Sequence, residues 1–267
     1  MSDAPKILVF DSGLGGLTVL REVVRSEPGA DFTYVADDAF FPYGQHSEAA
    51  LIARVVPLLG DLIIAHLPDL IVIACNTAST IVLPHLRAEY QVPFVGTVPA
   101  IKPACAKSAS KMVSVLGTRG TVAREYTHTL IRNFAGDCHV NLVGSEHLAP
   151  LAEAALAGGD ISDDDIRNEI MPCFLGKADD PAKRTDTVVL ACTHYPLLIA
   201  RMMRLAPWPV TWLDPAPAIA RRAADLLGDR RARQGRGLAR LIFTSGKPHP
   251  MTASKALAPF FGGRMPA

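Results

Sequence analysis

The sequence carries one short pattern twice: an apolar run that ends in Ala-Cys and is followed by small polar residues. The first copy, residues 71–79, reads IVIACNTAS, and the second copy, residues 188–196, reads VVLACTHYP. A run of about five apolar, β-prone residues that ends in a polar turn is typical of a central strand in a parallel sheet covered on both faces. The pattern therefore predicts two equivalent strands, each of which delivers a cysteine, Cys75 or Cys192, to its carboxyl end.

We expect a helix after each cysteine, with Thr77 as the cap of a helix over residues 78–89 and Thr193 as the cap of a helix from about residue 196. Each sulfur then lies at the carboxyl end of a strand and faces a helix N-terminus, which is where open α/β sheets bind ligands. The N–H groups and dipole of such a terminus lower the pKa of a thiol and attract carboxylates. A single cysteine of this kind is more often a small buried apolar residue. The duplication favours a functional pair.

The other strand ends recur in the same order in both halves of the chain. Residues 7–10 predict a strand that ends in the loop Asp11-Ser-Gly-Leu-Gly-Gly16, and residues 112–116 predict a strand that ends in Gly117-Thr-Arg-Gly-Thr121. Both halves close with a strand that ends in proline and alanine. Further strands are expected at residues 32–36, 93–96, 140–143, 210–213 and 241–243. Further helices are expected at residues 47–66, with a kink or break at Pro57, and at residues 149–157 and 218–227.

This repeated order predicts a duplicated unit and not two unrelated domains. The fold class that we expect is α/β, with two similar parallel-sheet α/β domains related by pseudo-two-fold symmetry. The first domain would contain residues 1–97 and 207–267, and the second would contain residues 98–206. Equivalent strand ends would then converge, so we expect the active site in the cleft between the domains, with the two thiols on opposite sides of one ligand.

The charge balance and the apolar runs exclude several classes of protein. The chain has 27 Lys and Arg against 26 Asp and Glu, a net charge of +1, which gives no overall reason to expect a nucleic-acid or membrane partner. Only the short apolar stretch ILVF precedes Asp11, so a signal peptide is not expected. The longest apolar neighbourhood, residues 62–75, is interrupted by His66, Pro68 and Asp69 and does not predict a transmembrane helix.

The cysteines themselves restrict the compartment and the chemistry. There are five, an odd number with no CxxC pair, which argues against a disulfide framework and against a zinc site. Free thiols are suited to a reducing cytoplasm, so a cytoplasmic protein without a metal is expected.

Two stretches resemble binding motifs only superficially. The glycines at positions 13, 15 and 16 do not make a dinucleotide loop, since Thr18 stands where the third glycine is needed, and the Gly-Lys pair of a P-loop is missing. We interpret this segment as a polar site loop, because Asp11 and Ser12 end a strand as Cys75 does. A run of arginines among glycines lacks interleaved aromatic residues and is typical of a solvated loop. These arginines are at positions 230, 231, 233, 236 and 240.

Two cysteines that face one ligand admit three chemistries. A redox pair needs sulfurs close enough to bond, and catalytic thiols of that kind usually occur as CxxC. Nucleophilic catalysis would use His194, although residues two apart on a strand-to-helix turn need not touch. Inversion of a stereocentre needs a base on one face and an acid on the other, and a thiolate and a thiol fit both roles. None of the strand-end motifs contains a lysine, which argues against a pyridoxal phosphate enzyme.

The motifs closely resemble those of the glutamate racemases, in an order and spacing that span most of the chain. They are Asp11-Ser-Gly-Leu-Gly-Gly16, Pro42-Tyr-Gly44, Cys75-Asn-Thr77, Leu116-Gly-Thr118 and Cys192-Thr-His194. The resemblance implies a cofactor-independent enzyme that interconverts L- and D-glutamate and supplies D-glutamate for peptidoglycan. It also implies that the protein is a homodimer and that its ligand is the small-molecule substrate, glutamate. Neither a membrane nor a nucleic acid is expected as a partner.

The resemblance further implies roles for individual residues. Cys75 would handle the proton of the D enantiomer and Cys192 that of the L enantiomer, with Asp11, His194 and Glu153 as assisting catalytic groups. Glu153 lies in Pro150-Leu-Ala-Glu153, where the family usually has proline-leucine-valine-glutamate, although Ser145-Glu-His precedes it in place of the usual cysteine-proline. The implied substrate contacts are Asp11, Ser12, Pro42, Tyr43, Gly44, Asn76, Thr77, Thr118, Thr121, Thr193 and His194.

Two alternatives remain open at this point. An aspartate racemase or another two-cysteine isomerase of the same superfamily would share the cysteine motifs, but aspartate enzymes typically carry glutamate where this chain has His194. A non-catalytic binding protein would keep the same pocket without turnover. Racemisation assays with several amino acids distinguish the three.

Overall fold

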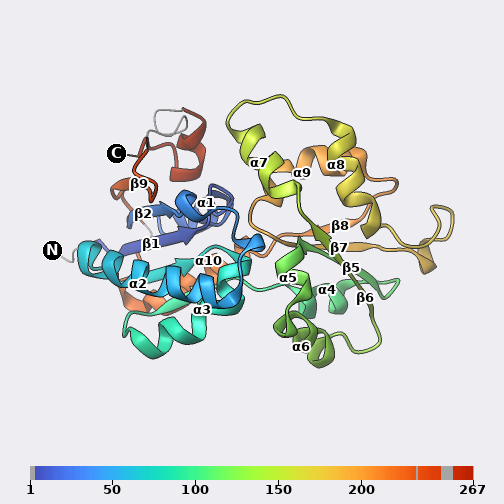
Figure 1. Cartoon of the computed structure of the whole chain (residues 1–267), viewed down its shortest axis with the longest axis horizontal. Helices are drawn as coiled ribbons and strands as arrows, with labels where there is room; N and C mark the ends of the chain where they lie inside the picture. Colours follow the sequence, from blue (N-terminus) through green and yellow to red (C-terminus); the bar gives the residue numbers. More distant parts are fainter. Residues whose placement is uncertain (1–3, 233, 248–254, 267) are drawn as a thin grey trace. The chain divides into compact units, whose positions relative to one another are not determined.

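The chain forms two α/β units, each built on one parallel sheet (Figure 1). The structure, a computed structural model, describes residues 4–232, 234–247 and 255–266. Contacts divide the chain into Met1–Thr97 with Ala216–Ala267 as the first unit and Val98–Pro215 as the second. The second unit ends at Pro215 and not at residue 206, because the strand that precedes Pro215 pairs within the second sheet. The prediction of two parallel-sheet α/β domains is confirmed.

The first sheet has five strands in the order β4-β3-β1-β2-β9, and every pairing is parallel. The strands are β1 (Lys6–Asp11), β2 (Asp31–Ala36), β3 (Leu70–Ile73), β4 (Phe94–Gly96) and β9 (Ala239–Phe243). The helices of this unit are α1 (Leu17–Ser26), α2 (Glu48–His66), α3 (Asn76–Glu89) and α10 (Ala216–Leu227). Short 3₁₀ helices complete it: η1 (Asp38–Phe40), η2 (Tyr43–Gln45), η6 (Gly228–Arg230) and η7 (Lys255–Phe261).

The second sheet has four parallel strands in the order β6-β5-β7-β8. They are β5 (Met112–Thr118), β6 (His139–Ser145), β7 (Thr187–Ala191) and β8 (Thr211–Leu213). The helices are α4 (Ile101–Lys107), α5 (Arg119–Ala123), α6 (Glu125–Phe134), α7 (Leu148–Leu156), α8 (Asp163–Ile170) and α9 (Ile199–Leu205). The 3₁₀ helices are η3 (Met171–Cys173), η4 (Pro181–Lys183) and η5 (Tyr195–Leu198).

The two sheets share one topology. If the strands of each unit are numbered from one to four along the chain, both sheets have the order 4-3-1-2, and the first sheet adds β9 beside its second strand. The cysteine motifs follow the third strand in both units, β3 and β7. The internal duplication expected from the repeated strand ends is therefore present in the strand order.

Helices cover both faces of the first sheet. On one face, α2 and α3 pack together over alternate residues of the strands, which include Leu8, Phe10 and Ile71. On the other face, α1 packs against α10. Strands buried on both sides read as continuous apolar runs, which is why β1 and β3 were recognisable in the sequence.

The helix α2 runs unbroken from Glu48 to His66, so the break expected at Pro57 is absent. Pro57 and Ala53, whose carbonyl loses its helical partner, both lie on the exposed side, where water can satisfy that carbonyl. Among the described helices, α2 is the one that is long and apolar enough to cross a membrane, and 22% of its most apolar 18-residue stretch is buried. Its buried residues, Leu51, Val55, Leu59 and Leu62, pack in the core over the sheet.

The arginine-rich stretch is tied to the first unit and is not simply a solvated loop. Arg231 Nε lies 2.6 Å from Oε1 of the fully buried Glu27, and Ala232 N donates to Glu27 Oε2 at 2.8 Å. Arg230 pairs with Asp69 at 2.6 Å. Arg233 lies outside the described residues. These ion pairs hold the segment that leads from α10 to β9 against the first unit.

We expect Glu27→Ala to lower the free energy of unfolding by about 3 kcal/mol, because it removes the buried partner of a guanidinium and of a backbone N–H. Glu22→Ala is the matched control. It breaks solvent-accessible pairs with Arg21 and Arg25 and should cost no more than about 1 kcal/mol. Urea denaturation followed by circular dichroism measures both, and equal small effects would contradict the role of Glu27.

Candidate active site

The first and third strands of each unit are neighbours, and the chain leaves them toward opposite edges of the sheet. The gap between the carboxyl ends of these two strands is the switch point at which open α/β sheets bind ligands. Asp11 is the last residue of β1, and Cys75 follows β3 by two residues. Ala74 N donates to Phe10 O at 2.7 Å, so the pairing of β1 and β3 continues to Ala74, the residue directly before the cysteine. Asp11 and Cys75 therefore leave the same edge of the sheet side by side.

The loop after β1 is built around the buried Asp11 carboxylate. Asp11 Oδ2 accepts hydrogen bonds from Gly16 N at 2.9 Å and Gly13 N at 3.3 Å, and Tyr34 Oη donates to Gly13 O at 2.8 Å. A Cβ atom on Gly16 would lie 2.7 Å from Asp11 Cβ and 2.8 Å from Tyr34 Oη, so only glycine fits there. These glycines serve close packing around a carboxylate, in agreement with a polar site loop.

Cys75 itself caps the helix that follows it. Its Sγ accepts from Ala78 N at 3.5 Å, whereas the sequence predicted Thr77 as the cap; the helix starts two residues earlier than expected, at Asn76. The Cys75 thiol also donates to Ser12 Oγ at 3.8 Å. The helix N-terminus and the Ala78 N–H donor favour negative charge on this sulfur, which is the requirement for a base.

Tyr43 is fully buried, and an ionic network that the sequence did not reveal fixes its phenol. Tyr43 Oη donates to Asp37 Oδ2 at 2.6 Å, Arg54 Nη2 lies 2.6 Å from Asp37 Oδ1, and Thr244 Oγ1 donates to Asp37 Oδ1 at 2.5 Å. Burial opposes ionisation of Asp37, but the hydrogen bonds from Arg54, Thr244 and Tyr43 outweigh it and lower the pKa of this carboxyl. Burial first, and then the charges of Asp37, Cys75 and Asp11, raise the pKa of Tyr43 far above its usual range. Tyr43 is therefore a neutral hydroxyl close to Asp11 and Cys75.

Asn76 carries the clearest sign of a ligand in the first unit. Both side-chain polar atoms, Oδ1 and Nδ2, are buried and have no hydrogen-bond partner among the described residues. A buried amide without partners is costly, so such a group normally has a function or a ligand. Thr77, the next residue, is also buried. We call Asp11, Ser12, Tyr43, Cys75 and Asn76 the first half-site.

In the second unit, the equivalent strand ends are those of β5 and β7, which pair up to Gly117 opposite Ala191. Thr118 ends β5 and caps α5, because its Oγ1 accepts from Thr121 N at 3.1 Å. The hydroxyls of Thr118 and Thr121 lie 2.9 Å apart. In the strand register, Gly117 opposite Ala191 corresponds to Asp11 of the first unit, so Thr118 takes the place that Ser12 has there.

Cys192, His194 and Glu153 form a connected chain of side chains. Cys192 Sγ lies 3.7 Å from His194 Nδ1, and His194 Nε2 lies 2.8 Å from Glu153 Oε1 on α7. Burial opposes protonation of His194, but its hydrogen bonds to Cys192 and Glu153 outweigh burial and raise the pKa of the imidazole well above 6.5. The Cys-His contact that the sequence left open is present, and Glu153 orients the ring. We call Thr118, Thr121, Glu153, Cys192 and His194 the second half-site.

The remaining predicted residues surround these groups. Pro42 and Gly44 flank Tyr43 and are half-buried, and Thr193 is buried between Cys192 and His194. Thr193 does not cap a helix: η5 begins after His194 without a side-chain cap and leads into α9. Within residues 4–232, 234–247 and 255–266, no group of three His, Cys, Asp or Glu side chains is placed to hold a metal ion.

Comparisons with known proteins agree with these motifs. A family model described as Asp/Glu/Hydantoin racemase matches residues 11–223. The glutamate racemase of Sinorhizobium medicae is 54% identical over 263 residues, 98% of this chain and 95% of that protein. The glutamate racemase of Brucella anthropi is 59% identical over 227 residues, which are 85% of this chain and 81% of that protein. The crystal structure of Escherichia coli glutamate racemase with L-glutamate and the activator UDP-MurNAc-Ala matches at a TM-score of 0.84 and 40% identity, covering 96% of this chain and 93% of that one.

We expect Glu153→Gln to lower the pKa of His194, because it removes the carboxylate that stabilises the imidazolium. Since the folded-state pKa of His194 is raised, the pair contributes most stability below about pH 6.5 and loses it as the pH rises through the folded-state value. The substitution should therefore destabilise the protein more at pH 6 than at pH 9. NMR titration of the His194 ring measures the shift, and Glu146→Gln, which removes an exposed carboxylate paired with Arg119, is the control. An unchanged midpoint in Glu153→Gln would contradict the contact.

Proposed function

The chain belongs to the Asp/Glu/Hydantoin racemase family, and from that membership we propose that it is a glutamate racemase, which interconverts L- and D-glutamate. The resemblance predicted from the sequence motifs is confirmed. The observation that carries the proposal is the pair of cysteines after equivalent strands of two units with the same topology, each with its own polar partners. The D-glutamate formed would supply peptidoglycan synthesis, the role that the family resemblance implies.

The proposed reaction is a proton transfer at Cα in which two thiols act on opposite faces of one substrate. One cysteine, as a thiolate, removes the Cα proton and becomes a thiol. The other cysteine, as a thiol, donates its own proton to the opposite face of the carbanion and becomes a thiolate. One S–H bond forms and one breaks, so no electrons enter or leave, and no oxidant or cofactor is needed. The protein ends each turnover with the two protonation states exchanged.

The two half-sites would support this exchange by different means. In the second half-site, the raised pKa of His194 keeps an imidazolium beside Cys192, and its positive charge favours removal of the proton of L-glutamate by this sulfur. In the first half-site, the N-terminus of α3 and the Ser12 hydroxyl face Cys75, which would act on D-glutamate. Neither arrangement needs a metal to generate a base.

Substrate contacts are proposed for the polar groups around the thiols. The amide of Asn76, which has no hydrogen bond to the described residues, can both accept from an ammonium group and donate to a carboxylate. The N-termini of α3 and α5 present N–H groups that suit the two carboxylates of glutamate. Ser12, Pro42, Tyr43, Gly44, Thr77 and Thr193, with Asp11, Thr118, Thr121 and His194, complete the proposed contacts.

A cytoplasmic homodimer stays a prediction. All five cysteines are free thiols, which supports a reducing compartment. Light scattering on the purified protein would give a mass of about twice 28.6 kDa for the dimer.

We expect Asn76→Ala to raise the KM for glutamate at least tenfold while leaving the melting temperature unchanged or higher. The reason is that its buried amide makes no hydrogen bond with the residues that the structure describes and costs stability, whereas a bound substrate would pair it. Asn141→Ala is the matched control: Asn141 Nδ2 donates to Pro172 O at 2.9 Å, so its loss should lower the melting temperature and leave KM unchanged. A destabilised Asn76→Ala protein with normal KM would assign this residue to the fold.

The two-thiol reaction predicts that Cys75→Ala and Cys192→Ala each abolish racemisation, with far-ultraviolet circular dichroism unchanged. Cys138→Ala, which removes a half-buried thiol outside the two motifs, should retain activity. In heavy water, the D-glutamate first formed from L-glutamate should carry deuterium at Cα, while recovered L-glutamate carries little. Parallel assays with aspartate separate glutamate racemase from aspartate racemase. Early product that keeps its original Cα hydrogen would overturn the two-thiol reaction.

A further inference from the structure

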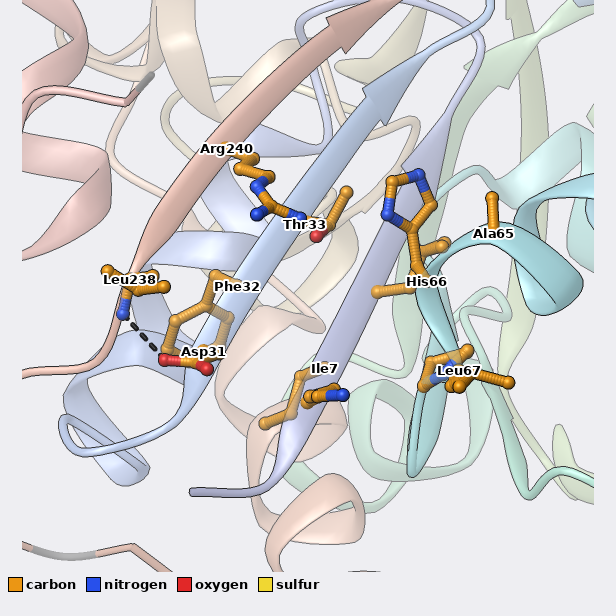
Figure 2. A pocket seen from close by; sticks show the side chains of 12 residues that line it. Ile7, Asp31, Phe32, Thr33, Ala65, His66, Leu67, Leu238 and Arg240 are labelled. Carbon is orange, nitrogen blue, oxygen red and sulfur yellow. Dashed lines mark hydrogen bonds between the residues drawn. The ribbon is translucent and has the colours of Figure 1, made fainter. Parts of the chain in front are cut away.

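A cavity of about 260 Å³ lies at the amino-terminal ends of β1 and β2, at the opposite end of these strands from Asp11 (Figure 2). One face of the sheet forms its floor, and the C-terminal residues of α2 form a wall. At about 3.3 Å per residue, Lys6 and Asp11 at the two ends of β1 lie roughly 16 Å apart. The cavity is therefore separate from the first half-site.

Three polar side chains from different elements converge on this cavity. Arg240 on β9 pairs in register with Thr33 on β2, which pairs with Leu8 on β1, so the three lie in one row across the sheet. His66 is the last residue of α2. Figure 2 shows the Arg240 guanidinium directed toward Thr33, with the imidazole of His66 beyond it. Guanidinium, hydroxyl and imidazole groups can all donate hydrogen bonds, so they form a receptor for an anion.

The charge of Arg240 is not neutralised within the part of the chain that the structure describes. Its side chain has no hydrogen bond or ion pair there, whereas Arg230 and Arg231 of the same segment both pair with carboxylates. The charge of Arg240 also acts on its neighbour His66. The pKa of His66 is lowered, chiefly by burial and secondly by the positive charge of Arg240. The carboxylate on the cavity wall is Asp31, whose Oδ1 already accepts from Leu238 N at 2.7 Å.

Two leucines add an apolar rim to these donors. Leu67 and Leu238 line the cavity and are 67% and 64% exposed, so both side chains are open to a ligand. Leu67 also follows α2 in the left-handed conformation, with φ 46°, which glycine or asparagine adopts with less strain. A leucine at this position presents its side chain to the cavity where a glycine would present none.

We propose that this cavity binds a small organic anion in which one carboxylate or phosphate head group is joined to a compact apolar body, such as a single aromatic ring. The head group binds Arg240, Thr33 and His66, and the apolar body packs on Leu67 and Leu238. The cavity volume lies just below the usual range for ligand pockets, which limits the apolar body to about one ring. The site is independent of the proposed racemase reaction.

Titrations with phenylacetate and phenyl phosphate, each with and without saturating glutamate, test the proposal and identify the head group. We expect the methyl NMR signals of Leu67 and Leu238 to shift, with a Kd of about 0.1–1 mM for the better probe, which is ordinary for a ligand of this size. Neutral 2-phenylethanol and inorganic phosphate should each bind at least tenfold more weakly. Equal binding of the neutral compound, shifts confined to other methyl groups, or competition by glutamate would overturn the proposal.

Two substitutions separate binding from fold stability. Arg240→Gln should weaken the better probe at least tenfold and leave racemisation unchanged, and Arg236→Gln, at an exposed arginine of the same segment, is the matched control. Leu67→Gly should raise the melting temperature, because it relieves the left-handed leucine, and yet weaken probe binding several-fold. A purely structural Leu67 would give the first effect without the second. Unchanged affinity in Arg240→Gln would refute the site.

Discussion

The parallel ladder between the first and third strands is the interaction on which each half-site depends. Because parallel strands end at one edge of the sheet, the residue that follows the third strand must lie beside the end of the first. Ala74 N still pairs with Phe10 O, and Gly117 is still opposite Ala191, at the last residues before the site loops. The position of each cysteine is thus determined by backbone hydrogen bonds within its own unit. The side chains around the sulfur are then free to differ.

They do differ, and the difference is chemical. Cys75 takes the N-cap position of α3, where N–H groups and a serine hydroxyl surround the sulfur. Cys192 is followed by a 3₁₀ helix, not by a regular helix, and a histidine oriented by Glu153 stands beside it. A helix terminus supplies a fixed partial charge, whereas a histidine supplies a full charge that depends on pH. One duplicated scaffold therefore surrounds its two cysteines with unlike polar groups, and the proposed reaction, in which each cysteine acts on a different enantiomer, allows that difference.

Much of the fold was predictable because its central strands, β1, β3 and β7, are buried on both faces and read as uninterrupted apolar runs. Local details were less so. The prediction of Thr77 as the helix cap was wrong because the Cys75 thiol accepts the capping hydrogen bond. The prediction of a break at Pro57 was wrong because Pro57 lies on the exposed side of α2, where water can bind the carbonyl that loses its helical partner. Glu153 came from the family resemblance and from no spacing rule, since its partner lies 41 positions away. The hydrogen bond between Asp37 and Thr244 joins residues that are 207 positions apart. Sequence periodicity predicts only local structure, so it could not predict this contact.

That bond also explains why the first unit needs the C-terminal segment. β9 is the outer strand of the first sheet and pairs with β2 from Phe32 to Ala36. This pairing brings Thr244, the residue after β9, to the carboxyl end of β2, where it donates to Asp37. Asp37 in turn fixes the phenol of Tyr43, close to Asp11 and Cys75. A strand added at the far end of the chain therefore orders the polar groups of the first half-site, although the family match itself ends at residue 223.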